Sequence, residues 1–412
     1  MKYMTLTALL FACLVLPAGD WSSKGEVTAE ARQFTDDNDP QTRDTGLGLF
    51  SRLETGLDNG GWRFRLRGFA RVDHEDDSRG LAALEEAWLG YRGGAWDLRL
   101  GFQMLNWTAT EAFHPADIVN SRNLDSNIEN PEKLGELMLS LRRKVGNGGL
   151  TLYYLPRLEE PNLPEASSRL SFIPPGFTIG RPIWLVGDGE ASGDSWADQY
   201  GVRFNQTVGD ADFSVHYLDH LDRQQPRFDV DAARRTIRPV YSSVRDLGAT
   251  YLHVLGSWIL KLEASHKDFQ GQSGAFAQFN QMDHSQLAFG LDYGWSTQGG
   301  GDATVILEGQ GVFGTTEEER AALSPFQRDL LVGYRHAWND IMGREMLVTF
   351  IFDIERSGEY LANTSYKQRL SDTWTLQTGF RWIEAEPEGP LPVGLENLHE
   401  ANQIYLNISR FF

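Results

Sequence analysis

The 412-residue chain contains a single cysteine, Cys13, and after its first twenty residues it has no long apolar run. With one thiol, a disulfide framework and thiolate sites for zinc or iron–sulfur clusters are excluded. Without a run of about 18 apolar residues, no helix of the remaining chain could cross a membrane. Basic residues are also few: 38 Lys and Arg face 57 Asp and Glu, and the net charge of -19 argues against nucleic acid as a partner.

The first residues are typical of a signal peptide, which we assign to residues 1–19. Lys2 provides a positive charge, residues 4–16 are apolar but too few to span a bilayer, and Ala18 and Gly19 are small. Cleavage after Gly19 would leave residues 20–412, without cysteine, as a single domain. A lipoprotein signal around Cys13 is the alternative.

The feature that the sequence has in abundance is strict alternation of apolar and polar residues. In residues 62–72, Trp62, Phe64 and Leu66 alternate with arginines, and the same period recurs in residues 96–104, 199–205, 258–265, 286–295 and 374–382. Segments of about 9–12 residues are long enough for a tilted strand to cross a bilayer. The pattern predicts an all-β fold, namely a transmembrane antiparallel β-barrel, and a large soluble sandwich is the alternative.

Aromatic residues and connection lengths support the barrel. Many apolar faces end in an aromatic residue, as expected at membrane interfaces: Trp62, Tyr91, Trp96, Tyr217, Trp258, Trp295, Trp374 and Trp382. Short glycine-containing turns alternate with long polar stretches at residues 105–133, 159–195, 221–243, 268–283, 314–326 and 386–399. This alternation predicts short periplasmic turns and long outer loops.

The number of strands follows from parity. About seventeen strands can be read between residues 47 and 411, and a downward strand at 47–57 requires an upward strand before it. Residues 26–34 are the candidate, which makes 18 strands; without 47–57 the count is 16. We expect residues 20–25 and 35–45 to lack regular structure, and a barrel of this size to enclose a water-filled lumen.

Two parts of the chain, the C-terminal residues and several stretches between residues 100 and 135, resemble known outer-membrane proteins. Residues 404–412 place Ile404, Leu406 and Ile408 on one face and end in Phe412, which resembles the C-terminal signal that the barrel-assembly machinery reads. Residues 100–107 (LGFQMLNW), 114–120 (HPADIVN), 125–129 (DSNIE) and 132–135 (EKLG) resemble a family of uncharacterised, porin-like bacterial outer-membrane barrels. That family is distantly similar to alginate-export-like barrels, and the resemblance implies the barrel fold but no substrate.

Candidate pore residues come from the alternation and from the long loops. Of the 38 basic residues, 31 are arginine, whose planar group suits carboxylate or phosphate. The predicted lumen-facing residues are Arg63, Arg65, Arg67, Arg71, Arg99 and Gln103. The arginines could select anions or merely pair with lumenal carboxylates. Loop 105–133 could fold inward as a constriction through Trp107, His114, Asp117 and Arg122, or form an outer cap, and the proline-rich loop 159–195 is a second plug candidate.

Catalysis and metal binding find little support. Gly193-Asp194-Ser195 resembles one esterase block, but no second block and no nucleophile elbow accompany it. Four residues of strand separate His216 from His220 by about 13 Å, too far for one metal ion. We therefore expect no enzyme, no cofactor and no metal.

The predicted function is passive diffusion of a small polar solute or saccharide, with an anion as one option, through the outer membrane of a Gram-negative bacterium. The alternatives are a loop-plugged docking barrel for an envelope complex and, last, an outer-membrane hydrolase. The expected partners are outer-membrane lipid, lipopolysaccharide bridged by divalent cations at acidic residues 73–77, the assembly machinery and the solute. The sequence gives no indication of an oligomer.

Overall fold

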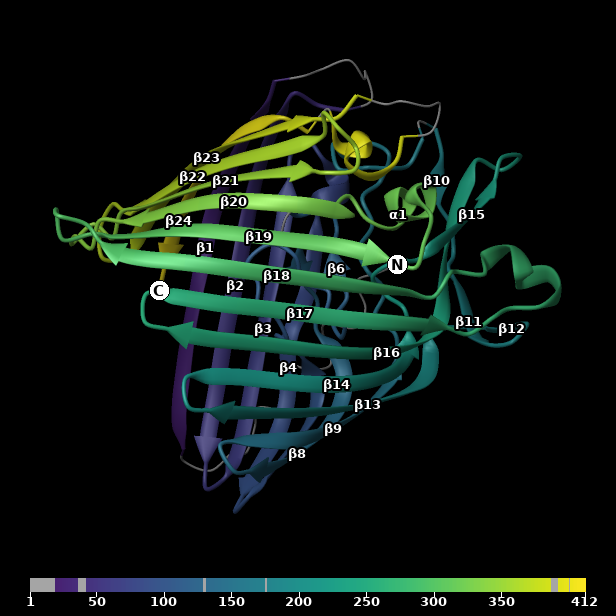
Figure 1. Ribbon diagram of the computed structural model, residues 1–412, viewed down its shortest axis with the longest axis horizontal. Coiled ribbons are helices and arrows are strands. Elements are labelled where there is room, and N and C mark those ends of the chain that lie inside the picture. The colour runs from purple at the N-terminus through teal and green to yellow at the C-terminus, as the bar shows by residue number, and fades with distance from the viewer. Residues whose placement is uncertain (1–18, 36–41, 129–130, 175, 387–391, 400) are drawn as a thin grey trace.

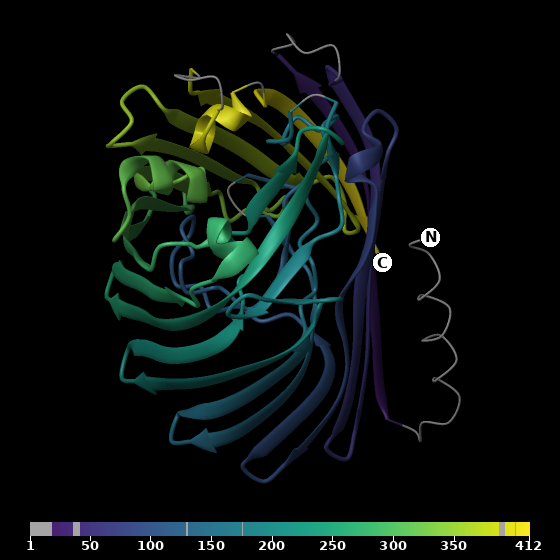
Figure 2. The ribbon, with the colours of Figure 1, turned by 90° about the vertical axis from the view of Figure 1, so that its right-hand side faces the viewer.

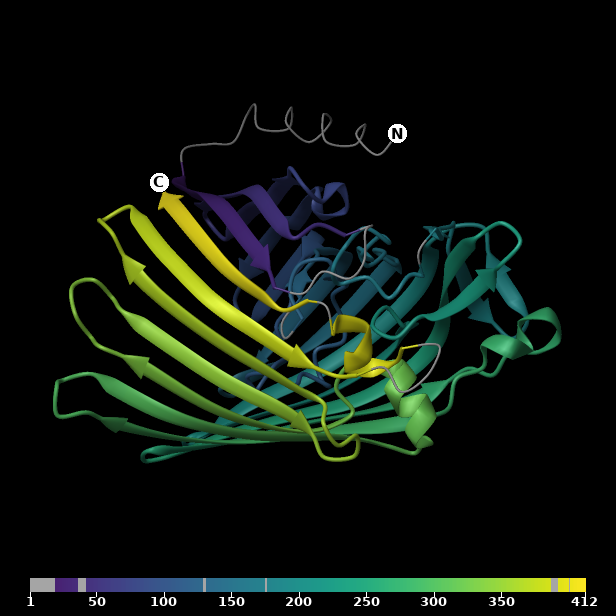
Figure 3. The same ribbon diagram turned by 90° about the horizontal axis from the view of Figure 1, so that it is seen from above.

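The computed structural model describes residues 19–35, 42–128, 131–174, 176–386, 392–399 and 401–412. Residues 1–18 of the predicted signal peptide therefore lie outside the described residues. The chain forms one large sheet that closes into a barrel (Figures 1 and 3). Of the 22 strands in this sheet, 18 form the wall and four short ones lie in loops. The predicted antiparallel barrel of 18 strands is thus confirmed, and the count of 16 is wrong.

The wall strands follow one another around the barrel in chain order. They are β1 (Asp20–Phe34), β2 (Thr45–Asn59), β3 (Trp62–Asp73), β4 (Leu81–Gly93), β5 (Trp96–Gln103), β8 (Glu136–Val145), β9 (Gly148–Arg157), β13 (Trp196–Val208), β14 (Ala211–Leu221), β16 (Thr236–Leu255), β17 (Trp258–Phe269), β18 (His284–Ser296), β19 (Asp302–Phe313), β20 (Arg328–Ala337), β21 (Glu345–Asp353), β22 (Tyr360–Arg369), β23 (Trp374–Glu384) and β24 (Gln403–Phe411).

The barrel closes between its first and last strands. Residues 26–34 of β1 pair with β24, as the parity argument requires, and the whole of β1 also pairs with β2. The expectation that residues 20–25 lack regular structure is wrong, since β1 begins at Asp20 and its first residues pair with residues 53–58 of β2. The physical reason is that an unpaired backbone edge is costly in a membrane.

The turns and loops segregate to opposite ends of the barrel (Figure 1). At one end, tight turns such as that between β2 and β3 place Gly60 at φ +54°, a conformation that suits glycine. At the other end lie the long connections, as predicted. Predicted loop 221–243 is not all irregular, because it contains the hairpin that β15 (Arg227–Asp231) forms with the beginning of β16.

The outer surface of the wall is apolar and carries aromatic residues near both rims. All eight aromatic residues predicted to lie at interfaces are exposed by 38–54%. Several of them contact another aromatic residue, for example Trp258, whose ring centroid lies 4.5 Å from that of Tyr293. Trp62, Trp96, Trp258 and Trp374 begin their strands at the turn end, whereas Trp382 lies near the loop end of β23. A wall with this surface faces lipid.

The remaining elements lie in the loops. Helical turns are η1 (Asp77–Arg79), η2 (Gly274–Phe279), α1 (Glu317–Leu323) and η3 (Gly394–Leu398). Among the described residues, none of the helices combines the length and the apolar character needed to cross a bilayer. The short strands are β6 (Arg122–Asn123), β7 (Glu132–Lys133), β10 (Thr178–Ile179), β11 (Ile183–Gly187), β12 (Glu190–Ser192) and β15. Figure 2 looks onto the loop end, where these segments lie across the mouth of the barrel.

Candidate constriction and pore lining

The loop between β5 and β8 crosses the lumen to the far wall. Glu263 of β17 accepts hydrogen bonds from the backbone N–H groups of Ala109 (2.5 Å), Thr110 (2.9 Å) and Ala116 (3.2 Å). Glu308 of β19 accepts from those of Glu111 (2.6 Å) and Ala112 (2.9 Å). In wall order β19 stands eight positions after β5 in a barrel of 18, so the loop reaches nearly the opposite side.

The beginning of this loop is fixed by a buried aromatic cluster. The Trp107 side chain is 2% exposed. Its ring centroid lies 5.7 Å from that of Tyr153 and 4.6 Å from that of His216, and the Arg203 guanidinium lies over it at 5.1 Å. Because Tyr153, Arg203 and His216 belong to β9, β13 and β14, Trp107 attaches the loop to the wall next to its own origin.

Asp117 holds the loop together internally. Its carboxylate pairs with Arg122 at 2.5 Å and with Lys133 at 2.7 Å, and it accepts a hydrogen bond from the Trp107 backbone N–H at 3.1 Å. Burial alone would raise the pKa of Asp117, but Lys133 and Arg122 hold it below its usual range. The structure thus brings Trp107, Asp117 and Arg122 together. The His114 carbonyl accepts a hydrogen bond from the Asp117 backbone N–H at 3.2 Å, whereas the His114 side chain has its Nδ1 3.7 Å from Glu263.

The four arginines of β3 each have a carboxylate partner. The pairs are Arg63 with Asp97 at 2.5 Å, Arg65 with Asp58 at 2.8 Å, Arg67 with Glu85 at 2.7 Å, and Arg71 with both Glu30 at 3.1 Å and Glu132 at 2.6 Å. Arg99 of β5 also contacts Asp97, at 3.4 Å. Structural pairing therefore applies to every arginine of the predicted ladder, and Arg71, with a side chain only 5% exposed, is the most enclosed.

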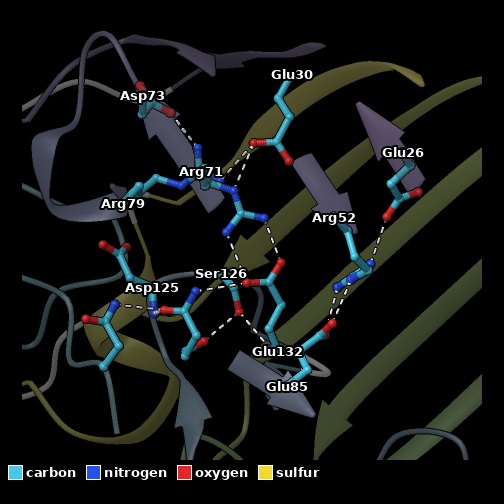
Figure 4. Close-up of polar contacts among 12 residues, drawn as sticks. Glu26, Glu30, Arg52, Arg71, Asp73, Arg79, Glu85, Asp125, Ser126 and Glu132 are labelled. Carbon is cyan, nitrogen blue, oxygen red and sulfur yellow. Dashed lines mark hydrogen bonds and ion pairs between the residues drawn. The ribbon is translucent and has the colours of Figure 1, made fainter. Parts of the chain in front are cut away.

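Figure 4 shows how Arg71 joins the wall to the loop. Arg71 lies between Glu30 of β1 and Glu132 of β7, within the loop. Glu85 accepts from both Arg52 and Arg67. The network therefore cross-links β1 to β4 with the segment that returns the loop to the wall.

A small cavity of about 200 Å³ lies beside the first part of the loop and carries the arginines that sequence reasoning missed. It is lined by Arg99, Arg142 and Arg203 together with Asp97. Arg142 is exposed, and within the described ranges it has no carboxylate at ion-pair distance. The alternation in β8 and β13 could have placed both Arg142 and Arg203 inside. Gln103 also lines this cavity but is 2% exposed, donating to the Met138 carbonyl and accepting from Ser140.

The opposite wall is rich in carboxylates that the solute cannot reach. Glu263 and Glu308 are 0% and 1% exposed because the loop covers them. Asp292 pairs with Lys261 at 2.7 Å, and Asp222 pairs with Lys267 at 3.1 Å. These carboxylates are thus covered or paired with lysine, whereas Arg142 remains exposed.

The two histidines of β14 have different surroundings. His216 packs against Trp107, and His220 Nδ1 lies 2.8 Å from the Leu221 carbonyl. In the part of the chain that the structure describes, no three His, Cys, Asp or Glu side chains gather as metal ligands would.

Solved structures share this architecture, although no protein-family model and no curated protein matches the sequence. The Pseudomonas aeruginosa OccK5 (OpdH) structure is similar with a TM-score of 0.54 and 13% identity over 96% of this chain and 99% of that chain. The OccK8 (OprE) structure of the same organism is similar with a TM-score of 0.54 and 10% identity over 96% of this chain and 99% of that chain. For OccD3 (OpdP) the TM-score is 0.52, with 11% identity over 95% of this chain and 91% of that chain.

At such identities the likeness concerns the fold. The finer similarity to alginate-export-like barrels stays a prediction. This chain shares the closed antiparallel β-barrel fold of these structures.

Proposed function

We propose that this chain is an outer-membrane channel for the passive diffusion of small polar solutes. One observation carries the proposal: loop 104–135 crosses the lumen and is held on the far wall by Glu263 and Glu308. A loop fixed in this way narrows a wide barrel to a defined passage. The passage then presents chosen side chains to a solute, which is how pores obtain selectivity.

The solutes that we propose are anionic. Arg99, Arg142 and Arg203 line one cavity beside the loop, with Asp97 as the carboxylate in the same lining. Asp97 already contacts Arg63, Arg92 and Arg99, so the cavity retains positive charge. An arginine without a carboxylate partner can take a carboxylate or phosphate group of a passing solute through two parallel hydrogen bonds. Because Arg63, Arg65 and Arg67 are each paired with a carboxylate, the proposal rests on Arg142 and Arg203.

Single-channel recording in planar bilayers, with a salt gradient to measure ion selectivity, tests the proposal. We expect steady conductance with anion preference, and Arg142→Glu should shift the reversal potential toward cation selectivity. The matched control is Arg143→Glu on the same strand. Arg143 lies on the outer face, over the ring of exposed Trp96, so this change should leave selectivity unaltered. Equal shifts in both variants, or cation preference in the wild type, would contradict the anionic assignment.

The docking barrel is the second candidate function, and one structural feature at the mouth of the barrel supports it. In the connection between β9 and β13, β10 and β11 run parallel to the outer part of β16 and thicken the rim. A folded protein that never conducts would replace the channel proposal with this one. The lipopolysaccharide contact, the assembly machinery and the envelope complex stay predictions.

A further inference from the structure

A second, larger cavity lies on the loop side of the crossing loop. Its volume is about 520 Å³, within the usual range for small-molecule sites. Five loops and the inner faces of β18 and β19 contribute to it, and Phe113, Pro115 and His114 of the crossing loop form part of its lining. A solute that approached the constriction from the loop end would meet this cavity first.

The lining has an unusual composition for this chain. Charged residues make up 23% of the sequence, yet Asp, Glu, Lys and Arg are missing from the described residues that line the cavity. Apolar side chains predominate. Two aromatic pairs stand out: Phe113 with Phe326, at 5.9 Å between ring centroids, and Phe172 with Phe228, at 4.9 Å.

Side-chain amides provide most of the polar part of the lining, together with His114 and Ser324. Gln286 of β18 and Gln310 of β19 come from the wall, and Gln224 and Gln225 come from the loop after β14. Gln225 accepts from Lys267 at 3.2 Å, and Gln224 donates to the Asp117 carbonyl at 2.7 Å. Neutral amides can orient a hydroxyl or carbonyl group, but they cannot neutralise an ion.

We propose that this cavity binds an uncharged, ring-bearing molecule with a flat apolar face and one or two hydrogen-bonding groups. The inference rests on the proposed channel and extends it by naming a second solute class. An ion would lose hydration here without gaining an opposite charge. A flat apolar ring instead gains aromatic contacts from Phe172 and Phe228 and a polar contact at Gln286. The cavity would concentrate neutral ring compounds at the entrance.

Resorcinol is a suitable probe because it is flat, soluble and uncharged at neutral pH. Saturation-transfer NMR with the full chain in lipid nanodiscs, corrected with empty nanodiscs, would measure binding. The double change Phe172→Ala with Phe228→Ala should weaken resorcinol binding by roughly tenfold. Phe276→Ala is the matched control, because Phe276 is a half-buried loop phenylalanine outside the cavity lining.

A second variant guards against misfolding of the first. Gln286→Glu changes one wall side chain and should also weaken resorcinol binding, because it adds a charge that the lining cannot pair. Benzenesulfonate, the same ring with a charge, should bind at least tenfold more weakly than resorcinol. Equal benzenesulfonate binding, displacement of resorcinol by myo-inositol, or unchanged binding in both variants would overturn the inference. If the protein conducts, such a result would contradict the binding proposal and leave the channel proposal unaffected. If the barrel binds resorcinol but does not conduct, only the channel proposal would be contradicted.

Discussion

At the scale of single residues, the most informative group is Asp125, in the crossing loop just after β6. It is fully buried and accepts hydrogen bonds from Ser78 at 2.9 Å and Ser168 at 2.5 Å. Three separate loops therefore meet at one carboxylate. Burial, and then the neighbouring Asp76, raise the pKa of Asp125 from 3.8 to about 6, against the smaller opposing effects of the Ser168 and Ser78 hydrogen bonds and of Arg79.

The raised pKa predicts a pH-dependent attachment of the loop. Because the folded-state pKa exceeds the unfolded one, ionisation destabilises the folded junction. This cost is absent below about pH 4 and approaches about 3 kcal/mol above about pH 6. Hydrogen exchange of residues 121–127 should therefore be slower at pH 5 than at pH 7.5, after correction for intrinsic rates. Asp125→Asn should remove the difference, and a difference that persists in the variant would exclude Asp125 as its source.

Alternation predicts the side of a strand that a residue faces, but it cannot identify partners that are remote in sequence. The lumenal positions of Arg63 and Arg67 follow from a period of two. Their pairing with Asp97 and Glu85 does not, because it depends on the register between neighbouring strands. Arg410, two residues before Phe412, lies 5.8 Å from the Trp374 ring, as a cation can at a lipid headgroup level.

At the scale of elements, the course of the crossing loop is the feature that determines the passage. Its length and its mixture of aromatic and charged residues indicated a functional loop, but inward folding and an outer cap were equally consistent with the sequence. Glu263 lies 147 to 154 residues away from the amides that it binds. No local pattern carries that information, so only the structure could assign the loop to the lumen.

Removing one of the two loop anchors should release the loop. In Glu263→Gln, a neutral amide replaces a buried carboxylate that accepts from three backbone N–H groups and from the Thr110 hydroxyl. Charge-assisted hydrogen bonds to buried amides are lost, and we expect a cost of about 2–4 kcal/mol. The measurement is single-channel current noise, which should rise together with the mean conductance.

Glu308→Gln provides the graded comparison. Glu308 accepts from two backbone N–H groups rather than three, so its substitution should have the same direction and a smaller effect. Quiet, wild-type currents in Glu263→Gln would show that other contacts, such as those of Trp107, suffice to hold the loop.

At the scale of the whole molecule, the barrel depends on a seam between its two ends. The Gly25 backbone N–H donates to the Phe412 carbonyl at 2.9 Å, and the Phe412 N–H donates to the Gly25 carbonyl at 3.0 Å. The number of strands and their closure were predictable, because parity and alternation act on every strand alike. The beginning of β1 at Asp20 was not, since residues 20–25 are mostly polar and resemble a free terminus.

Deletion of Phe412 should weaken this seam. It removes two backbone hydrogen bonds, which contribute about 1 kcal/mol each, together with the terminal aromatic side chain. The fraction of heat-modifiable, compact protein after refolding into lipid should fall, and its thermal transition should move to lower temperature. Phe412→Tyr keeps both hydrogen bonds and is the control. If the deletion refolds as completely and as stably as the control, the seam does not limit closure.

The way in which Glu263 and Glu308 hold the crossing loop has a consequence for how such a protein can change over generations. Both carboxylates bind backbone N–H groups of residues 109–112 and 116, and the backbone is the same for nearly every amino acid. Apart from Thr110, whose hydroxyl also contacts Glu263, these anchors place few demands on loop side chains. Mutation can therefore alter the surface that a solute meets while the path of the loop is inherited unchanged.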